Sequence, residues 1–319
     1  MIKAVCSYFD LMKDNELSQS DKLFMHYLAN QAGIPQYYYP MLNVGTDVDE
    51  EVSLQTFCNY VHESSMVVGN GVTLHRYQKE VLNMFTKEHR NRYFLSAATS
   101  FGKTFLIYEV VRKMRYSNIA FIFPTISLLS ENIFKIYTKP EYTWIKDNFV
   151  IHTLSDTEIL GERNMFIFTP ERYLSFLDKN NSLNLDFVFV DEVYKLDNGF
   201  IIDETSQENE RDVAYRIALY ELLKDENTDA LLAGPYIVFP ETVAHDYQSS
   251  FKAFLDKYGF VPIDYNLYDI VDKDEITINT AQNVKVSDTF KLAFTEKTKK
   301  ARVVQLVKQL LEKSENTII

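Results

Sequence analysis

The feature that most constrains the fold of this chain is an apolar segment that runs into a Gly-Lys-Thr turn. Residues 93–97 have the composition of a strand, residues 97–104 read Ala-Ala-Thr-Ser-Phe-Gly-Lys-Thr, and residues 103–115 have helical spacing. In a strand–turn–helix unit of this kind, the backbone N–H groups of the turn point at nucleotide phosphates. Lys103 would reach the terminal phosphates, and the Thr104 hydroxyl would bind Mg²⁺. The segment therefore predicts a phosphate-binding loop in an α/β fold.

An acidic pair after a second apolar segment complements this loop. Residues 187–190 read Phe-Val-Phe-Val, and Asp191 and Glu192 follow them directly. An Asp in this place can hold the metal ion, and the adjacent Glu can polarise a water molecule for attack on the γ-phosphate. We therefore predict an ATP hydrolase that uses ATP and Mg²⁺. Lys103, Asp191 and Glu192 would be catalytic, with Thr104 and Asp191 as metal ligands.

Strand-like and helix-like segments alternate from residue 93 onward. The strands are expected at 93–97, 119–123, 149–153, 165–168, 187–190 and 230–232, and the helices at 103–115, 128–137, 172–177 and 213–223. This alternation predicts a parallel sheet with helices on both faces. Ligands of such sheets bind beyond the carboxyl ends of the strands, where the Gly-Lys-Thr turn and the acidic pair both lie. Residues 199–211 are acidic and polar, and we expect an exposed loop there.

The first 72 residues have a different pattern. Helical spacing predicts helices over Tyr8–Leu17 and Asp21–Gln31, and Ser18–Ser20 offers a cap for the second. We therefore expect a mainly helical accessory region over residues 1–72, followed by an ATP-binding domain over residues 73–319.

Composition narrows the classes of function. No apolar run approaches the ~18 residues of a membrane span, and the N-terminus lacks the basic and apolar segments of a secretory signal. The two cysteines and six scattered histidines have no metal-ligand spacing. We therefore expect buried thiols in a reducing cytoplasm, with no membrane partner and no histidine-bound metal.

The formal net charge of −12 is unevenly distributed. Residues 1–72 carry 3 basic and 9 acidic side chains, residues 73–130 carry 9 and 3, and residues 131–319 carry 21 and 33. The block around the phosphate-binding loop is therefore the only basic one, and a solvated helix face would explain most of its charge. Net charge weakens the case for a nucleic-acid partner without excluding one.

The remaining motifs resemble those of the superfamily 2 helicases. Motif I of that family reads Ala-x-Thr-Gly-x-Gly-Lys-Thr, and residues 97–104 match it except that Ser100 replaces a Gly. A Ser fits this position if its φ angle stays negative. Gln78 lies 25 residues before Lys103 and resembles the adenine-binding element of the family, because its amide can both donate to and accept from the base. The resemblance implies the following nucleotide-binding residues: Gln78, Thr99, Ser100, Phe101, Gly102, Lys103 and Thr104.

Two turns that contain threonine and proline resemble motifs Ia and Ib. The first is Phe-Pro-Thr at residues 123–125, and the second is Phe-Thr-Pro-Glu-Arg at residues 168–172. Hydroxyl groups and helix N-terminal N–H groups at such turns suit nucleic-acid phosphates. The resemblance therefore implies that Thr125, Thr169 and Arg172 contact the nucleic-acid backbone. The alternative is that each threonine only caps a helix.

The chain departs from the family pattern at two further motifs. Tyr194 follows Asp-Glu-Val in motif II, where the family usually has Asp or His. The best match to motif III is Ala-Gly-Pro at residues 233–235, which lacks the hydroxyl groups of Ser-Ala-Thr. The resemblance implies that Tyr194 affects the coupling between nucleotide and nucleic acid more than it affects hydrolysis.

The resemblance implies a RecA-like P-loop NTPase domain with a mostly parallel sheet, the first of two such domains in a helicase or translocase. We expect nucleic acid as partner, with DNA favoured over RNA, and a second RecA-like domain that supplies an arginine to the phosphoryl group. Residues 312–319 look like the entry to that domain, so we expect a fragment with weak ATP binding and slow hydrolysis. The first alternative is a motor subunit of a restriction or phage-defence complex, which translocates without unwinding and has a protein partner in a defence or repair complex. The second alternative is an ATP-binding switch that needs no nucleic acid.

Overall fold

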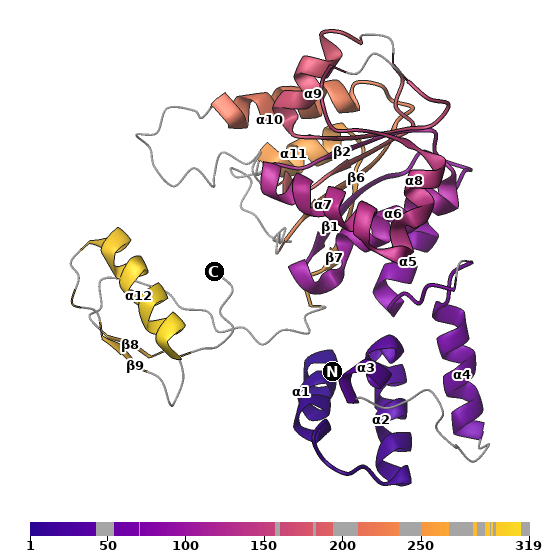
Figure 1. Cartoon of the computed structure of the whole chain (residues 1–319), viewed down its shortest axis with the longest axis vertical. Coiled ribbons are helices and arrows are strands. Elements are labelled where there is room, and N and C mark those ends of the chain that lie inside the picture. The colour runs from indigo at the N-terminus through magenta and orange to yellow at the C-terminus, as the bar shows by residue number, and fades with distance from the viewer. Residues whose placement is uncertain are drawn as a thin grey trace. The chain divides into compact units, whose positions relative to one another are not determined.

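The computed structural model divides the chain into two compact units, Met1–Ile270 and Val271–Ile319 (Figure 1). The described residues are 1–42, 54–69, 71–156, 160–180, 183–193, 210–235, 250–267, 283–285, 291–293, 295 and 298–313. The loop predicted at residues 199–211 lies outside them up to residue 209, and a helix begins at Glu210. The domain boundary predicted after residue 72 stays a prediction.

A seven-stranded parallel sheet forms the centre of the first unit. Its strands are β1 (Arg92–Ala97), β2 (Asn118–Ile122), β3 (Val150–His152), β4 (Asn164–Phe168), β5 (Phe187–Val190), β6 (Asp229–Gly234) and β7 (Val261–Tyr265). They lie in the order β3-β4-β2-β5-β6-β1-β7, and every neighbouring pair is parallel. All six predicted strands are confirmed. β7 is an additional strand at the edge of the sheet, next to β1.

Helices cover both faces of this sheet, as the alternation predicted (Figure 1). On one face, the helices α5 (Arg76–Met84), α6 (Lys103–Met114), α7 (Ile126–Thr138) and α8 (Thr143–Asn148) share a core with the sheet, and buried side chains of the N-terminal helices join the same core. The helices of the other face are α9 (Pro170–Leu177), α10 (Glu210–Leu223) and α11 (Ser250–Lys257). Within β1, Leu95 belongs to the first core and Phe94 to the second, because successive strand residues point to opposite faces. The sheet is therefore buried on both sides, as a RecA-like α/β fold requires.

The N-terminal region is helical, as predicted, but its first helix begins earlier than expected. The helices are α1 (Ile2–Met12), α2 (Gln19–Ala32), α3 (Tyr38–Leu42) and α4 (Leu54–Met66). The predicted span Tyr8–Leu17 was wrong because Ser18 caps α2, in a reciprocal capping box with Asp21, and the chain must leave α1 before that cap. A short 3₁₀ segment at Pro35–Tyr37 joins α2 to α3.

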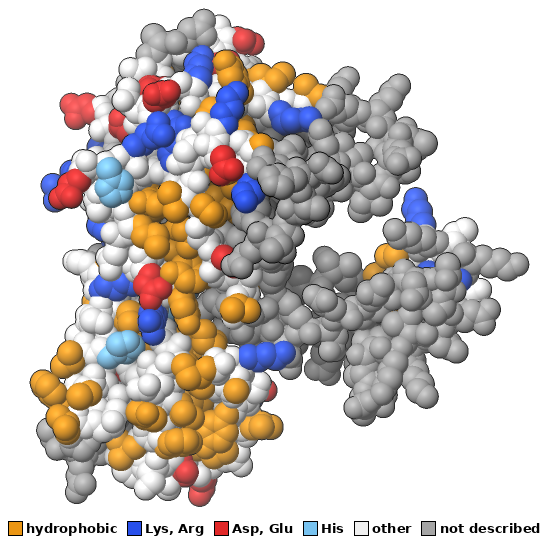
Figure 2. Space-filling view, turned by 180° about the vertical axis from the view of Figure 1, so that it is seen from behind, with side chains coloured by type: hydrophobic (Ala, Val, Ile, Leu, Met, Phe, Trp, Pro, Cys, Tyr) orange, Lys and Arg blue, Asp and Glu red, His pale blue; other side chains and the backbone are white. Residues whose placement is uncertain are grey.

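Many apolar side chains of this helical region face solvent. Leu54, Phe57 and Val61 of α4 follow one another at helical spacing, and all three are exposed. Cys58 of the same helix is exposed too, so the expectation of two buried thiols is confirmed for Cys6 and was wrong for Cys58. In Figure 2, hydrophobic side chains are spread over the lower part of the view, where the N-terminal helices lie. These side chains contrast with the five inner strands of the sheet, β1, β2, β4, β5 and β6, whose side chains are almost all buried.

The second unit is small. An antiparallel hairpin of β8 (Asn283–Lys285) and β9 (Lys291–Ala293) precedes α12 (Lys299–Lys313). The start of a new sheet was predicted near the C-terminus, and residues 314–319 lie outside the described part of the chain. Within the described residues, none of the helices has both the length and the apolar character needed to cross a membrane.

Candidate functional site

The predicted phosphate-binding loop lies between β1 and α6. β1 ends at Ala97, Thr99–Phe101 form one 3₁₀ turn, and α6 begins at Lys103. Among the described residues, Arg115 and Glu192 are the non-glycine positions with positive φ, so the φ angle of Ser100 is negative. The expectation that a serine fits this place in the loop is confirmed.

Gly102 turns the chain from the loop into the helix. Its φ angle is +76°, in the left-handed region that side chains rarely adopt. A β-carbon at this position would also lie 2.7 Å from the amide nitrogen of Gln78. The backbone angle therefore requires a glycine here, and the close approach of the Gln78 amide also disfavours a side chain.

Lys103 opens α6 with its ammonium group turned back over the loop. The side chain is buried, and its Nζ donates to the carbonyl oxygens of Ala97 and Ala98, each at 3.0 Å. The first N–H groups of a helix have no partner within the helix, so the start of α6 offers donors to an anion. The lysine charge and these N–H groups lie at the same end of the helix.

The acidic pair lies at the carboxyl end of β5, two strands away from β1. Asp191 is held by its backbone, because its N–H donates to Ile122 at 3.1 Å and its carbonyl accepts from the Tyr215 hydroxyl at 2.8 Å. Its Oδ1 accepts from the N–H of Glu192 at 2.9 Å. Glu192 has a φ angle of +52°, which is costly for a residue with a β-carbon. Backbone strain of this kind is concentrated at functional sites.

A cavity of about 330 Å³ joins the loop to the acidic pair. Its lining comes from the loop, from the acidic pair, from α7 and from the end of β6: Thr99, Gly102, Lys103, Thr104, Phe105, Leu128, Glu131, Lys135, Tyr142, Asp191, Glu192 and Pro235. The structure thus brings together the predicted Lys103, Thr104, Asp191 and Glu192, although about 90 residues separate the two pairs. Gln78, Ser100 and Phe101 are not part of the lining.

The donors and acceptors at this cavity suit a nucleoside triphosphate with its metal ion. Hydroxyl and carboxylate oxygens from Thr104 and Asp191 are the ligand types that Mg²⁺ prefers. The Oγ of Ser100 is buried and has no hydrogen-bond partner among the described residues, so the loop holds one unused polar group.

Gln78 is buried beside the loop, where two contacts hold its amide. Its Nε2 donates to the carbonyl of Phe101 at 2.9 Å, and its Oε1 accepts from the N–H of His75 at 3.3 Å. His75 completes the link, because its Nδ1 accepts from the N–H of Gln78 at 3.1 Å and its Nε2 lies 3.0 Å from the Phe101 carbonyl. His75 was missed by the sequence analysis, since only the fold brings α5 against the loop.

Burial decides the protonation state of His75. Removal from water lowers the pKa of its imidazole to about 4, although the hydrogen bond to the Phe101 carbonyl acts in the opposite direction. The ring is therefore neutral at pH 7. Because Nδ1 accepts a hydrogen bond from Gln78, we assign the proton to Nε2, which donates to Phe101.

The three predicted nucleic-acid contacts lie at the carboxyl ends of β2 and β4. Thr125 caps α7 and accepts from the N–H of Leu128 at 3.3 Å, and Thr169 caps α9 and accepts from the N–H of Arg172 at 3.4 Å. The Arg172 guanidinium donates to the carbonyl of Thr153 at 3.0 Å. All three residues thus have a structural role, and β2 and β4 are neighbours in the sheet.

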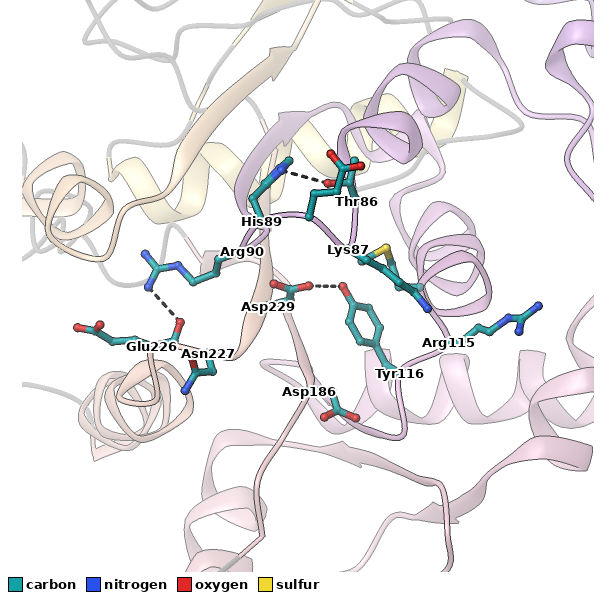
Figure 3. Close-up of a pocket in the computed structure, with 12 residues that line it drawn as sticks. Thr86, Lys87, His89, Arg90, Arg115, Tyr116, Asp186, Glu226, Asn227 and Asp229 are labelled. Atoms are coloured by element: carbon teal, nitrogen blue, oxygen red, sulfur yellow. Dashed lines mark hydrogen bonds between the residues drawn. The ribbon is translucent and has the colours of Figure 1, made fainter.

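A larger cavity, of about 660 Å³, lies at the opposite edge of the sheet (Figure 3). Its residues belong to the segments that lead into β1, β2, β5 and β6, at the amino ends of those strands. Asp229 accepts from the Tyr116 hydroxyl at 2.6 Å, and Arg90 donates to the carbonyl of Glu226 at 3.0 Å. Ligands of parallel sheets bind at the carboxyl edge, so the smaller cavity is the candidate site.

The parallel sheet with helices on both faces is a RecA-like α/β fold. Residues 71–224 match the family model of the type III restriction enzyme, res subunit. This part of the chain therefore forms a domain similar to that helicase-like family, and the match supports an ATP-dependent, helicase-like motor.

The solved structure described as "ATP-dependent Type ISP restriction-modification enzyme LlaBIII bound to DNA" is similar over 60% of this chain, with 14% identity and a TM-score of 0.40. The chain covers 15% of that protein. The search of curated proteins found no match.

Proposed function

We propose that this domain binds Mg·ATP in the 330 Å³ cavity and hydrolyses it to drive movement along nucleic acid. The observation that carries this proposal is that Lys103 and Thr104 from one strand end face the same cavity as Asp191 and Glu192 from another. A lysine, a hydroxyl and two carboxylates at one cavity are the groups that phosphoryl transfer to water requires.

Each group would have a distinct part in hydrolysis. Lys103 would move its ammonium from the loop carbonyls to the β- and γ-phosphates, and the N–H groups of Gly102 and Thr104 would hold their oxygens. Glu192 would orient the attacking water and accept its proton. Its strained backbone would keep the carboxylate in a fixed position as the reaction proceeds.

The metal ion would depend on the nucleotide for most of its ligands. Among the residues that the structure describes, no group of three or more His, Cys, Asp or Glu side chains could hold a metal ion. Mg²⁺ commonly uses one or two protein oxygens together with phosphates and water. Thr104 and Asp191 would supply those protein oxygens, so Mg²⁺ would bind with ATP.

Gln78 would bind adenine only after a rearrangement. Both ends of its amide are engaged, with Phe101 and with His75. A base at this point would have to replace at least one of these hydrogen bonds. We therefore propose that Gln78 connects nucleotide binding to the position of the loop.

The nucleic acid would contact the carboxyl ends of β2 and β4. A threonine hydroxyl that accepts from a helix N–H still has its own proton, which it can donate to a phosphate oxygen. Thr125 is half-buried and offers this proton at the surface, whereas Thr169 is buried. Thr125 is thus the stronger candidate, and Arg172 would add a cation beyond the end of the neighbouring strand β4. Contacts of this kind hold a backbone without reading sequence, so they suit DNA and RNA alike.

The family match favours one form of this function. Because residues 71–224 match the res-subunit model, we propose a motor subunit of a restriction or defence complex that translocates on DNA. A nucleic-acid-independent ATP switch is the competing proposal, since Pro235 lines the cavity where related motors carry a hydroxyl. The two proposals differ in whether DNA alters ATP turnover.

The whole chain would be tested for Mg·ATP binding by calorimetry and for turnover with single- and double-stranded DNA and RNA. Lys103→Ala should abolish binding, whereas Glu192→Gln should keep binding and lose turnover. Lys139→Ala, which removes an exposed lysine elsewhere, is the matched control. Stimulation by a nucleic acid supports the motor, and turnover that ignores every nucleic acid supports the switch. Failure of the wild-type chain to bind Mg·ATP would refute both.

A further inference from the structure

Phe101, which directly precedes Gly102 in the loop, is fully buried between two aromatic rings from distant parts of the chain. The His75 ring meets it edge-on, with centroids 4.8 Å apart and an angle of 85° between the planes. The Tyr265 ring stacks on it, with centroids 5.7 Å apart and an angle of 13°. Because Phe101 is one residue from Gly102, the position of its ring constrains the direction of the Gly102–Thr104 N–H groups.

Tyr265 is the last residue of β7, and the sheet fixes its place. In the parallel pairing of β7 with β1, Tyr265 lies opposite Ala97, the residue at which the loop begins. The next residue, Asn266, accepts from the Ser96 hydroxyl at 3.0 Å. The end of β7 is thus joined to the end of β1 by backbone pairing and by a side-chain hydrogen bond.

A hydrogen bond to α5 refines the direction of the Tyr265 ring. Its hydroxyl donates to Oε2 of Glu80 at 2.7 Å, and Glu80 also accepts from Nε of Arg76 at 2.8 Å. Burial alone would raise the pKa of Glu80, but the hydrogen bonds from Tyr265 and Arg76 outweigh it and hold the pKa below its usual value. Glu80 is therefore ionised at pH 7, and the bond from Tyr265 is charge-assisted.

We propose that Tyr265 is a positioning residue for ATP binding, which holds the phosphate-binding loop through Phe101 and is itself oriented by Glu80. The proposal rests on the ATP site proposed above. No motif of the sequence indicates this residue, because it lies 162 positions after Lys103 (265 − 103) and outside the matched family segment. The stacked ring is the essential part, and the hydroxyl refines its direction.

The test is calorimetric titration of the whole chain with Mg·ATP, together with kcat and KM for turnover. Tyr265→Leu removes the ring and should weaken binding by about 3- to 10-fold, the range of an aromatic pair. Tyr265→Phe and Glu80→Gln keep the ring and should stay within about 2-fold of the wild type. KM should rise in Tyr265→Leu while kcat changes little, because the loop would contact ATP in the ground state as well as in the transition state. Tyr220→Leu, an exposed tyrosine of α10, is the matched control.

A double-mutant cycle separates positioning from a general loss of structure. Phe101→Leu removes the other member of the stack, so its effect and that of Tyr265→Leu should not add in the double variant. Phe101→Leu also serves alone if Tyr265→Leu does not fold. Wild-type affinity in a folded Tyr265→Leu protein, or fully additive losses in the cycle, would overturn the proposal. A wild-type chain that does not bind Mg·ATP would instead refute the ATP site itself.

Discussion

The amide nitrogen of Gln78 lies 2.7 Å from the point where a β-carbon on residue 102 would lie. The loop and the start of α5 are therefore packed together as closely as the absence of a side chain at Gly102 allows. Gln78 and Gly102 are each motif residues in the sequence, and the structure shows that each restricts the other.

Replacing Gly102 by Ala should damage both the stability and the binding of nucleotide. The φ angle of +76° alone should cost about 1–2 kcal/mol. The Gln78 amide must also move away from the new β-carbon, which disturbs its hydrogen bond to the Phe101 carbonyl of the loop. We expect Mg·ATP binding to weaken by at least about 10-fold, for which ~1.4 kcal/mol suffices. Gly71→Ala is the matched control, because Gly71 has a φ angle of +79° with nothing near its missing side chain. Equal ATP affinity in the two variants would contradict this account.

The stability of the domain should fall in mild acid because of His75. Its pKa is about 4 in the folded protein and 6.5 without the environment of the fold, so between these values the unfolded chain binds more protons. The free energy of unfolding should therefore decrease as pH falls from about 6.5 to 4, by up to about 3 kcal/mol. Above pH 6.5 this contribution should be complete and constant.

Urea unfolding at several pH values would measure this effect. In His75→Asn the side chain can still cap α5 but does not titrate, so the variant should lack this part of the pH dependence. Identical slopes for His75→Asn and the wild type between pH 6.5 and 4 would show that His75 is not responsible.

Relieving the backbone strain at Glu192 should abolish ATP turnover without lowering the stability of the protein. Glu192→Gly removes a cost of about 1–2 kcal/mol for positive φ and adds about 0.5–1 kcal/mol of chain entropy. We expect a variant that is as stable as the wild type or slightly more so, and that binds Mg·ATP without turnover. Thermal unfolding and ATP turnover would be measured together. A clear loss of stability in Glu192→Gly would argue against stored strain.

Thr125 can be tested for a second role beyond capping α7. Thr125→Val should cost about 1 kcal/mol through loss of the cap, which urea unfolding would measure. Thr125→Asn restores a good cap but no hydroxyl, so it should recover stability without recovering stimulation of turnover by nucleic acid. Thr125→Ser should recover both. Full stimulation in Thr125→Asn would leave capping as the function of this residue.

The regular parts of the fold were predictable because the sheet is buried on both sides. A strand such as β5 is a continuous apolar run, Phe187-Val-Phe-Val, and it stands out from its surroundings. β7 lacks this signal because Val261, Pro262 and Asp264 are exposed at the edge of the sheet and only Ile263 is fully buried. The strand that the sequence did not predict is therefore the one that carries Tyr265.

The candidate site was predictable where its chemistry requires functional residues to be neighbours in the chain. Lys103 and Thr104, and likewise Asp191 and Glu192, are neighbours in the chain, and their shared cavity follows from the strand-end rule. The contacts of Gln78 with His75 and Phe101 depend on how α5 packs against the loop, which no spacing in the sequence expresses.

The carboxylate of Asp229 at the amino edge of the sheet has a consequence for genetics. It accepts hydrogen bonds from the backbone and side chain of Asn91, at 2.7 and 2.8 Å, and from Tyr116 (Figure 3), all at the edge away from the 330 Å³ cavity. Lesions there should yield temperature-sensitive alleles that raising the expression level can rescue. Lesions at Lys103 or Glu192 should instead be dominant or null at every temperature. Random alleles should therefore fall into two groups, temperature-sensitive at the amino ends of the strands and temperature-independent at the carboxyl ends.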